Sequence, residues 1–580
     1  MLSKEKSDGS PSGSDFYHHQ DLESSNRRKP SVEDVINRRN SNAEDDLAAL
    51  GYTQELTRSR STLNVAFMSF VLASVPYGLS TTLYYPLVGG GPTTVIWGWC
   101  LVCLLMMCVA VSLGEIVSVC YLVLRAKATY LALNPRVQIL IDEKAYPVAG
   151  GVYYQSYMVS PPSYRKIMSW VNGWAFTLGN VIITLSVNFG TTLLLIGCIN
   201  IFKDANGDGI FQAAPYQTWL VFLAITLICN AISALGNKWL PLMDTITVGF
   251  TFVGVLAIIC CGLAIAAEGR RNASWVFGGF EVSSGWTPPG WAFCVGLLHA
   301  AYATSATGMV VSMAEEVHDP ARQVPKALVG ALGLNWLCGF IFLVPLSFIL
   351  PDISLVVNDP SAQPLPVILR SAIGNEGGAF ALTVPIIILG IFCGVACTTA
   401  SSRCVWAFAR DGAIPGYQKL GIANVNRKLE IPLNAMMASM VVQILLGLIS
   451  IGSSAGFNAF NGAGVIFLTL SYVTPVAISF INRRNKLAHA KWHLGAFGAF
   501  CNAVSIGKLS RSYNACTWTL ICIIAWCAFA IPLFSMPAAL PVDGTSMNYA
   551  SVVFFGGVVA SAVSRCLPHC TDNNHELTIR

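Results

Sequence analysis

The residues of this sequence that could do chemistry lie inside hydrophobic segments. Residues 291–326 begin as an apolar span, pass through a polar middle that holds Tyr302, Thr304 and Ser305, turn apolar again and end in an acidic stretch. A lipid-facing helix does not need a polar, glycine-bearing middle, whereas a broken membrane helix exposes unwound backbone there to a substrate cavity. We therefore predict that Tyr302, Thr304 and Ser305 line a substrate-binding site.

The first hydrophobic segment carries a second interruption of the same kind. Its middle holds Ser74, Pro76, Tyr77 and Gly78. Proline removes a backbone donor, and glycine permits unusual dihedral angles. Either interruption alone could be a simple kink, because both residue types are common in membrane helices. Two interruptions, in the first and sixth spans, favour an inverted repeat of five plus five helices around a central site. We add these four residues to the predicted substrate-binding set.

Three carboxylates lie at the ends of hydrophobic spans. Glu115 closes the second span, and Glu315 and Glu316 close the sixth. A carboxylate costs about 2.5–3.5 kcal/mol at the centre of a membrane helix and less toward its ends. We expect these carboxylates to pair with arginine or lysine on the cytoplasmic side and to form an inner gate; simple solvation at the membrane surface is the alternative.

The composition excludes several classes of protein. The chain has 580 residues, of which 54% are hydrophobic and only 11% are charged, whereas soluble domains carry about 25% charged residues. The net charge of +5 comes from basic residues in short loops, which predicts no nucleic-acid partner. We find no nucleophile–base pair, phosphate-binding loop or metal-ligand motif, so we expect no enzyme activity, no metal and no cofactor. The composition predicts an all-α polytopic membrane protein with lipid around it.

Twelve hydrophobic spans follow a polar tail. Residues 1–60 are rich in serine and charge and read as a disordered cytoplasmic tail. The transmembrane domain is expected over 61–565, with a tail over 566–580. The spans lie near 64–86, 93–118, 168–201, 217–236, 241–267, 291–314, 327–350, 379–409, 433–453, 458–481, within 494–540 and near 549–563. Basic residues gather in alternate loops, which predicts cytoplasmic termini.

Several stretches together resemble the amino acid–polyamine–organocation superfamily, and within it the fungal amino acid/choline permeases. The matching stretches are SLGEI…AYPVAGGVYYQ (112–155), SWVNGW (169–174), AYATSATGMVVSMAEEVHDPARQVPKA (301–327) and FARDGAIP (408–415). The resemblance covers roughly 50–565. It implies a LeuT-like fold of 12 transmembrane helices, with substrate held between broken helices 1 and 6. It also implies a secondary transporter of small amines or amino acids in the plasma membrane.

Choline is the substrate that the sequence favours. GABA-type members of the family often carry an aromatic–aspartate pair in helix six, and the stretch beginning at Tyr302 has no acid there. A quaternary ammonium is held by aromatic faces, each worth about 0.5–2 kcal/mol. Tyr77, Trp174 and Tyr302 are the candidates for that cage, although each could instead be a packing or interfacial residue.

Other functions stay open at this point. A permease for GABA or another amino acid is the main alternative, and a nutrient sensor that binds without transport is the alternative of another class. A negative-inside membrane potential favours entry of a cation by about 2.3 kcal/mol per 100 mV. The sequence leaves proton coupling and the oligomeric state open.

Two inserts and the end of the chain depart from the family pattern. Residues 119–144 separate two motifs that are nearly adjacent in the family, and residues 507–524 place two basic residues inside the eleventh span. Joining residue 506 to residue 525 would give an uninterrupted apolar helix. We interpret both inserts as translated introns, and the tail over 566–580 as the product of a third one; genuine loops are the competing interpretation.

The intron interpretation predicts that mature transcripts lack the codons for 119–144 and 507–524 and encode a different C-terminus. Sequencing of cDNA from the source cells tests this directly. Transcripts that uniformly retain all three segments would show that these residues are genuine protein.

Overall fold

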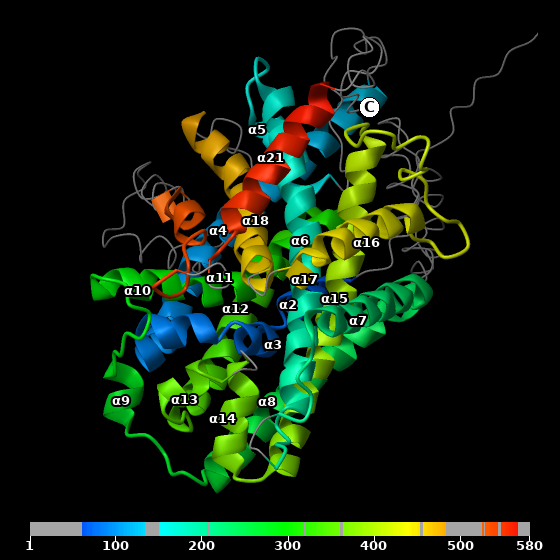
Figure 1. Ribbon diagram of the computed structural model, residues 1–580. Helices are drawn as coiled ribbons and strands as arrows, with labels where there is room; N and C mark the ends of the chain where they lie inside the picture. Colours follow the sequence, from blue (N-terminus) through cyan, green and yellow to red (C-terminus); the bar gives the residue numbers. More distant parts are fainter. Residues whose placement is uncertain are drawn as a thin grey trace, which may run out of the picture. The chain divides into compact units, whose positions relative to one another are not determined.

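Hydrophobic helices make up most of the chain that the computed structural model describes (Figure 1). The described residues are 61–133, 150–205, 209–317, 320–359, 363–452, 456–482, 525–526, 528–542 and 547–566. The predicted tail over 1–60, most of the predicted second tail and the whole insert over 507–524 lie outside these ranges. Of the first insert, the backbone continues as helix to Leu133, and the remainder lies outside them.

The helices are named here by their labels in Figure 1. They are α2 (Thr62–Ala73), α3 (Val75–Thr81), α4 (Tyr84–Leu133), α5 (Gly151–Val159), α6 (Arg165–Ile199), α7 (Pro215–Leu235), η2 (Asn237–Trp239), α8 (Leu240–Ile265), α9 (Ala273–Gly278), α10 (Pro289–Gly296), α11 (Leu298–Ser305), η3 (Ala306–Glu316), α12 (Pro320–Phe348), α13 (Ile353–Val357), α14 (Pro364–Ile373), α15 (Glu376–Arg410), α16 (Leu433–Gly447), α17 (Ile449–Gly452), α18 (Gly456–Ile481) and α21 (Ala550–Cys566).

The helices agree with the predicted all-α polytopic membrane protein. Within the described ranges, 10 helical segments are long and apolar enough to cross a membrane. They correspond to the first ten predicted spans. The predicted twelfth span appears as α21, which has 17 residues, and most of the predicted eleventh lies outside the described residues.

Both predicted interruptions are real breaks in the helices. The first span divides into α2 and α3 at Ser74. The sixth divides into α10, α11 and η3, the last of which winds as a 3₁₀-helix. The boundary between the first and second spans is also sharp, because α4 contains a non-helical turn at Gly90 and Gly91. Gly91 has φ 62° and ψ −146°, a conformation that essentially only glycine adopts.

The broken spans lie inside the bundle, and other helices present apolar faces outward. In the most apolar 18-residue window of the sixth span, 94% of the residues are buried, and for α6 the figure is 83%. The corresponding share for α7 and for α16 with α17 is 33%. Large apolar side chains such as Leu220, Leu227 and Leu445 are exposed there, as expected for a surface that faces lipid. The polar groups of the breaks are therefore kept from lipid by surrounding protein.

Short helices cover the two ends of the bundle. Figure 1 shows α9, α13 and α14 at one end and α5 at the other. The order of the helices agrees with this arrangement of the two ends. Helix α12 runs from the acidic end of η3 toward α13, and α15 runs back from α14. The sequence over 364–373 buries Leu365, Ile368 and Leu369, and α14 packs on α3, α6, α8 and α15.

Close packing of α15 against α3 and α6 depends on Gly390. A Cβ atom at this position would lie 2.6 Å from Cε2 of Tyr77 and 2.7 Å from Oγ1 of Thr191. Gly394, one turn later, would meet Oδ1 of Asn188 at 2.5 Å. The Gly-x-x-x-Gly pair thus allows α15 to approach two helices at once.

We expect Gly390→Ala to destabilise the protein by about 1–3 kcal/mol, because the added methyl must displace a buried tyrosine ring or the neighbouring helix. The readout is the unfolding temperature of detergent-solubilised protein. Gly330→Ala is the matched control, since a Cβ there meets nothing within 4 Å. Equal unfolding temperatures for the two variants would contradict the packing role.

Candidate functional site

The break in the first span follows from the position of one proline. Pro76 lies four residues after Leu72 and has no N–H, so the Leu72 carbonyl lacks the donor that it would have in a continuous helix. The Cys393 thiol of α15 donates to this carbonyl, with 3.3 Å between Sγ and O. Ser74, at the break itself, has φ 37° and ψ 57°, a left-handed conformation that costs about 1–3 kcal/mol for a non-glycine residue. Its buried hydroxyl has no partner among the described residues.

Tyr77 is held in the middle of the bundle by α6. Its hydroxyl donates to the Val187 carbonyl at 2.6 Å and accepts from Oγ1 of Thr191 at 3.0 Å. The side chain is 1% exposed. Pro76 lies in the first turn of α3. The N–H groups of a first turn have no partner within their own helix, so α3 loses no hydrogen bond through this proline.

The sixth span brings its own polar residues to the same region. Gly78 allows α3 to touch α11, because a Cβ there would lie 3.3 Å from Cβ of Ala303. Tyr302 of α11 is close enough to Tyr77 for their hydroxyl groups to interact electrostatically. The Tyr302 hydroxyl is buried and lies beside the Ser186 side chain of α6. The structure therefore places the tyrosines of the two broken helices together.

The hydroxyls of Thr304 and Ser305 form hydrogen bonds within their own helix. Thr304 donates to the Ala300 carbonyl at 2.9 Å, and Ser305 donates to the Tyr302 carbonyl at 2.9 Å. The backbone of Ser305, in contrast, bonds to another helix: its carbonyl accepts a hydrogen bond from Tyr472 of α18 at 3.1 Å. The sequence predicted substrate contacts for both side chains, and in this conformation their hydroxyls donate to carbonyls of α11 itself.

Trp174 lies apart from the two tyrosines. It precedes Val187 by 13 residues on α6, which corresponds to about 20 Å along the helix axis. Its ring packs edge-on against Phe408, with 5.5 Å between centroids, and also against Trp170. The three-ring cage expected from the sequence is thus not assembled here, because helix length separates one ring from the other two.

The two carboxylates at the end of η3 pair with arginines of α15. Glu316 accepts from Nε of Arg403 at 2.9 Å, and the side chains are 8% and 1% exposed. Arg403 also donates to Ser402 at 3.1 Å and to Asn237 at 3.0 Å. Since Asn237 donates to the carbonyls of the loop residues 429–430, this network joins the broken helix to two loops.

The second pair is partly exposed. Glu315 accepts from both terminal nitrogens of Arg410, at 2.7 and 3.5 Å, and the guanidinium lies 4.3 Å from the centroid of the Trp406 ring. The sequence predicted pairing with arginine or lysine, and both partners are arginines. Glu115 lies in α4 near the end of the second span and is partly buried. Whether the carboxylates act as a gate remains a prediction.

Comparison with known proteins decides the family. A family profile described as amino acid permease matches residues 141–559, well over half of the chain. The chain belongs to the amino acid permease family. It is accordingly a multi-pass membrane protein and a secondary transporter of amino acids or amines, which agrees with the expectation that it is not an enzyme.

Individual relatives of this permease differ in what their names say they carry. The choline transporter of Saccharomyces cerevisiae is 28% identical over 501 residues, which span 86% of this chain and 80% of the relative. The amino-acid permease BAT1 of Arabidopsis thaliana is 25% identical over 527 residues, covering 89% and 93% of the two chains. The polyamine transporter TPO5 of Saccharomyces cerevisiae is 25% identical over 524 residues, covering 90% and 77%.

The fold also matches a solved transporter structure. The crystal structure of MhsT in complex with L-phenylalanine superposes with a TM-score of 0.52 at 14% identity, and covers 82% of the permease and 99% of MhsT. This likeness confirms the LeuT-like fold that the sequence predicted, and it concerns the fold alone.

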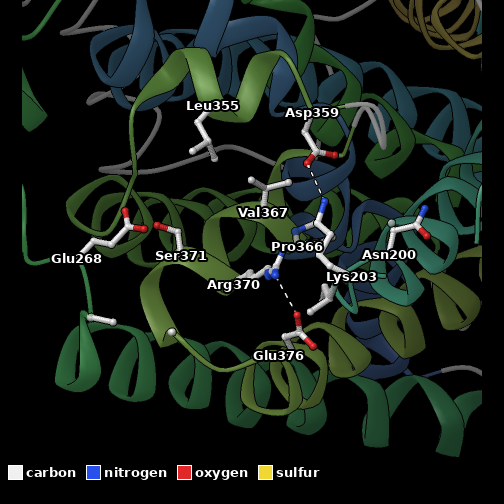
Figure 2. Close-up of a pocket in the computed structure, with 14 residues that line it drawn as sticks. Asn200, Lys203, Glu268, Leu355, Asp359, Pro366, Val367, Arg370, Ser371 and Glu376 are labelled. Atoms are coloured by element: carbon white, nitrogen blue, oxygen red, sulfur yellow. Dashed lines mark hydrogen bonds and ion pairs between the residues drawn. The ribbon is translucent and has the colours of Figure 1, made fainter. Parts of the chain in front are cut away.

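The permease also has a pocket at the end opposite to the paired carboxylates. Its volume is about 660 Å³, and it is lined by the end of α6, by α13 and α14, by the start of α15 and by the segments that follow α6 and α8. Figure 2 shows Lys203 directed at Asp359 and Arg370 directed at Glu376, at distances of 3.8 and 2.9 Å. None of the predicted substrate-binding residues lines this pocket.

Sequence analysis missed several side chains that the structure places at the breaks and at the carboxylates. Arg403 could have been found, because an arginine inside an apolar span is a functional signal in its own right. Cys393 carries no such signal, since cysteine in an apolar helix usually behaves as a small hydrophobic residue. Within the described ranges, no three His, Cys, Asp or Glu side chains are placed to hold a metal ion.

We expect Glu316→Gln to lower the unfolding temperature more than Glu315→Gln. Removing one partner of a buried pair costs about 3–5 kcal/mol, because the other charge stays buried, and the Glu315 pair is closer to solvent. Thermal unfolding of purified protein in detergent gives the comparison. The double variant Glu316→Gln with Arg403→Met should recover part of the loss. Equal shifts for both single variants would show that burial of the Glu316 pair is not what matters.

Proposed function

We propose that this permease imports choline or a closely related amine by alternating access. The observation that carries the proposal is the meeting of Tyr77 and Tyr302 at two helix breaks whose neighbouring sequence has no carboxylate. Residues 62–83 and 289–314 contain neither aspartate nor glutamate. A site of this kind supports a cation through aromatic faces and backbone carbonyls.

The chemistry of a quaternary ammonium suits such a site. The cation has no N–H donor, so it gains nothing from a single carboxylate hydrogen bond, and aromatic faces attract it by about 0.5–2 kcal/mol each. The left-handed Ser74 and the 3₁₀ turn of η3 keep backbone groups from forming regular helical bonds at this level. The similarity to a choline transporter supports the same choice of substrate.

The arginine–carboxylate pairs supply an inner gate in this proposal. Positive loop charge supports a cytoplasmic location for their end of the bundle and for both termini. Opening toward the cytoplasm would separate η3 from α15, and so break the pairs of Glu315 with Arg410 and of Glu316 with Arg403. We further propose residence in the plasma membrane, where the membrane potential alone can drive the import of a cation; proton coupling would add to that driving force.

Uptake of radiolabelled choline tests the proposal. The host is a yeast strain that lacks its own choline permease, and the chain as given is expressed beside a version without 119–144 and 507–524. We expect saturable uptake that falls when the membrane potential is collapsed. Uptake by the shortened version alone would in addition support the intron interpretation, and equal uptake by both would show that the inserts are tolerated loops.

The control is surface expression of both versions, measured with an epitope tag. If both reach the surface and neither takes up choline, the choline proposal is wrong. Uptake of radiolabelled GABA or another amino acid in the same cells would then assign the alternative substrate class. Ligand-dependent signalling without accumulation of any substrate would favour a sensor.

A further inference from the structure

The pocket at the end opposite to the paired carboxylates carries charges of both signs. Its volume of about 660 Å³ falls within the range of about 300–1,000 Å³ that is usual for small-molecule sites. Lys203 and Arg370 supply the positive charges of its wall, and Glu268, Asp359 and Glu376 supply the negative ones. A cavity of this size with charged side chains on its wall can hold a small polar ligand.

The two basic side chains keep most of their capacity to donate hydrogen bonds. Nη2 of Arg370 donates to Oε1 of Glu376 at 2.9 Å, and among the described residues this is the only hydrogen bond of a guanidinium that has five N–H donors. Nζ of Lys203 lies 3.8 Å from Oδ2 of Asp359, which is an ion-pair distance but too long for a hydrogen bond. Both bases can therefore donate to an anionic group in the pocket while they stay beside their carboxylates.

A carboxylate lies on the other side of the pocket. Figure 2 shows Glu268 across the pocket from Lys203. Glu268 is exposed, and within the described ranges it forms no ion pair with a basic side chain. The N–H of Ala267, next to it, donates to the Ala372 carbonyl of α14 at 2.8 Å, so this segment is fixed against the helix that carries Arg370. The wall can thus accept hydrogen bonds from a cationic group on one side and donate to an anionic group on the other.

The wall does not suit a quaternary ammonium. Among the described residues that line the pocket, none is aromatic, whereas aromatic faces are what attract such a cation. A carboxylate instead favours an ammonium that carries N–H groups, because it accepts charge-assisted hydrogen bonds from them. The pocket therefore fits a ligand that has a protonated amine and a carboxylate, which is the chemistry of a free amino acid.

We propose that this pocket is a second ligand site of the permease and binds a free amino acid. The carboxylate of the amino acid accepts from Arg370 and Lys203, and its ammonium donates to Glu268. The site goes beyond the proposed function, because its ligand differs in chemical class from choline and neither Tyr77 nor Tyr302 lines the pocket. Since the wall is built from α14, the start of α15 and the segments after α6 and α8, a bound ligand ties these elements together.

The test measures binding to the purified full-length protein in detergent. Each standard L-amino acid, β-alanine and GABA is screened for a rise in the unfolding temperature, since a ligand that binds only the folded state stabilises it. Isothermal titration calorimetry then gives the dissociation constants of the compound with the largest shift, of its methyl ester and of its N-acetyl derivative. The variants are Arg370→Gln and Glu268→Gln. Arg427→Gln, at an exposed position in the loop before α16, is the control.

We expect at least one amino acid to bind, and its ester and N-acetyl forms to bind at least tenfold more weakly, because each lacks one of the two charges. Arg370→Gln and Glu268→Gln should each raise the dissociation constant by about tenfold, since each removes a charge-assisted hydrogen bond. Arg427→Gln should leave it unchanged. Because Glu268 is exposed, its variant tests the site even if Arg370→Gln proves unstable.

Two results would overturn the inference. If none of these compounds raises the unfolding temperature, the pocket is not an amino-acid site. If one compound binds but both pocket variants keep full affinity for it, the compound binds elsewhere in the protein. Choline uptake reports on the proposed function separately. Weakened amino-acid binding in the pocket variants, together with no choline uptake by the wild type, would support this site and refute the proposed function.

Discussion

The structure depends on satisfying backbone groups where two helices break inside a membrane. Water is absent there, so each carbonyl released from its helix needs a partner from the protein. Pro76 deprives the Leu72 carbonyl of its helical N–H, and Cys393 replaces that donor. In the sixth span, the Ser305 carbonyl accepts from Tyr472, and the Thr307 carbonyl accepts from Ser69. The breaks are therefore stable only because particular side chains on other helices donate hydrogen bonds to their carbonyls.

One helix, α15, provides several of the hydrogen bonds and ion pairs that hold the broken helices. It gives the Cys393 thiol to the first break, and its Ala400 carbonyl accepts a hydrogen bond from Ser312 of η3 at 3.2 Å. Its last turns carry the arginines that pair with Glu315 and Glu316. A movement of η3 relative to α15 would therefore disturb hydrogen bonds and ion pairs together. This coupling suits the proposed transport mechanism, in which access to the site and the state of the paired end would change in the same motion.

The outer surface of the bundle and its centre follow opposite rules. Helices α7, α8 and α16 expose large apolar side chains, as lipid requires. The centre collects hydroxyls and amides from α6, α11 and α18, some of them bonded and some left without a partner.

The sequence alone determined the fold class, the spans within the described residues and the positions of both breaks. This was possible because a helix that crosses lipid must be long and apolar. Proline, glycine and hydroxyl residues within such a segment depart from that pattern and can be recognised in the sequence. It also located the carboxylates of the sixth span, since charge near hydrocarbon needs a partner.

Only the tertiary structure decided which side chains meet. It joined Tyr77 to Tyr302 and placed Trp174 in another cluster with Phe408. The residue types alone did not show that Trp174 lies far along α6 from the two tyrosines. It turned the Thr304 and Ser305 hydroxyls onto their own helix, and it chose Arg403 and Arg410 as the partners of the carboxylates. It also brought Asn461 to Ser186, 275 residues away in the chain. The physical reason is common to all of these: periodicity fixes which face of a helix a residue occupies, whereas the neighbour of that face is set by the packing of helices distant in sequence.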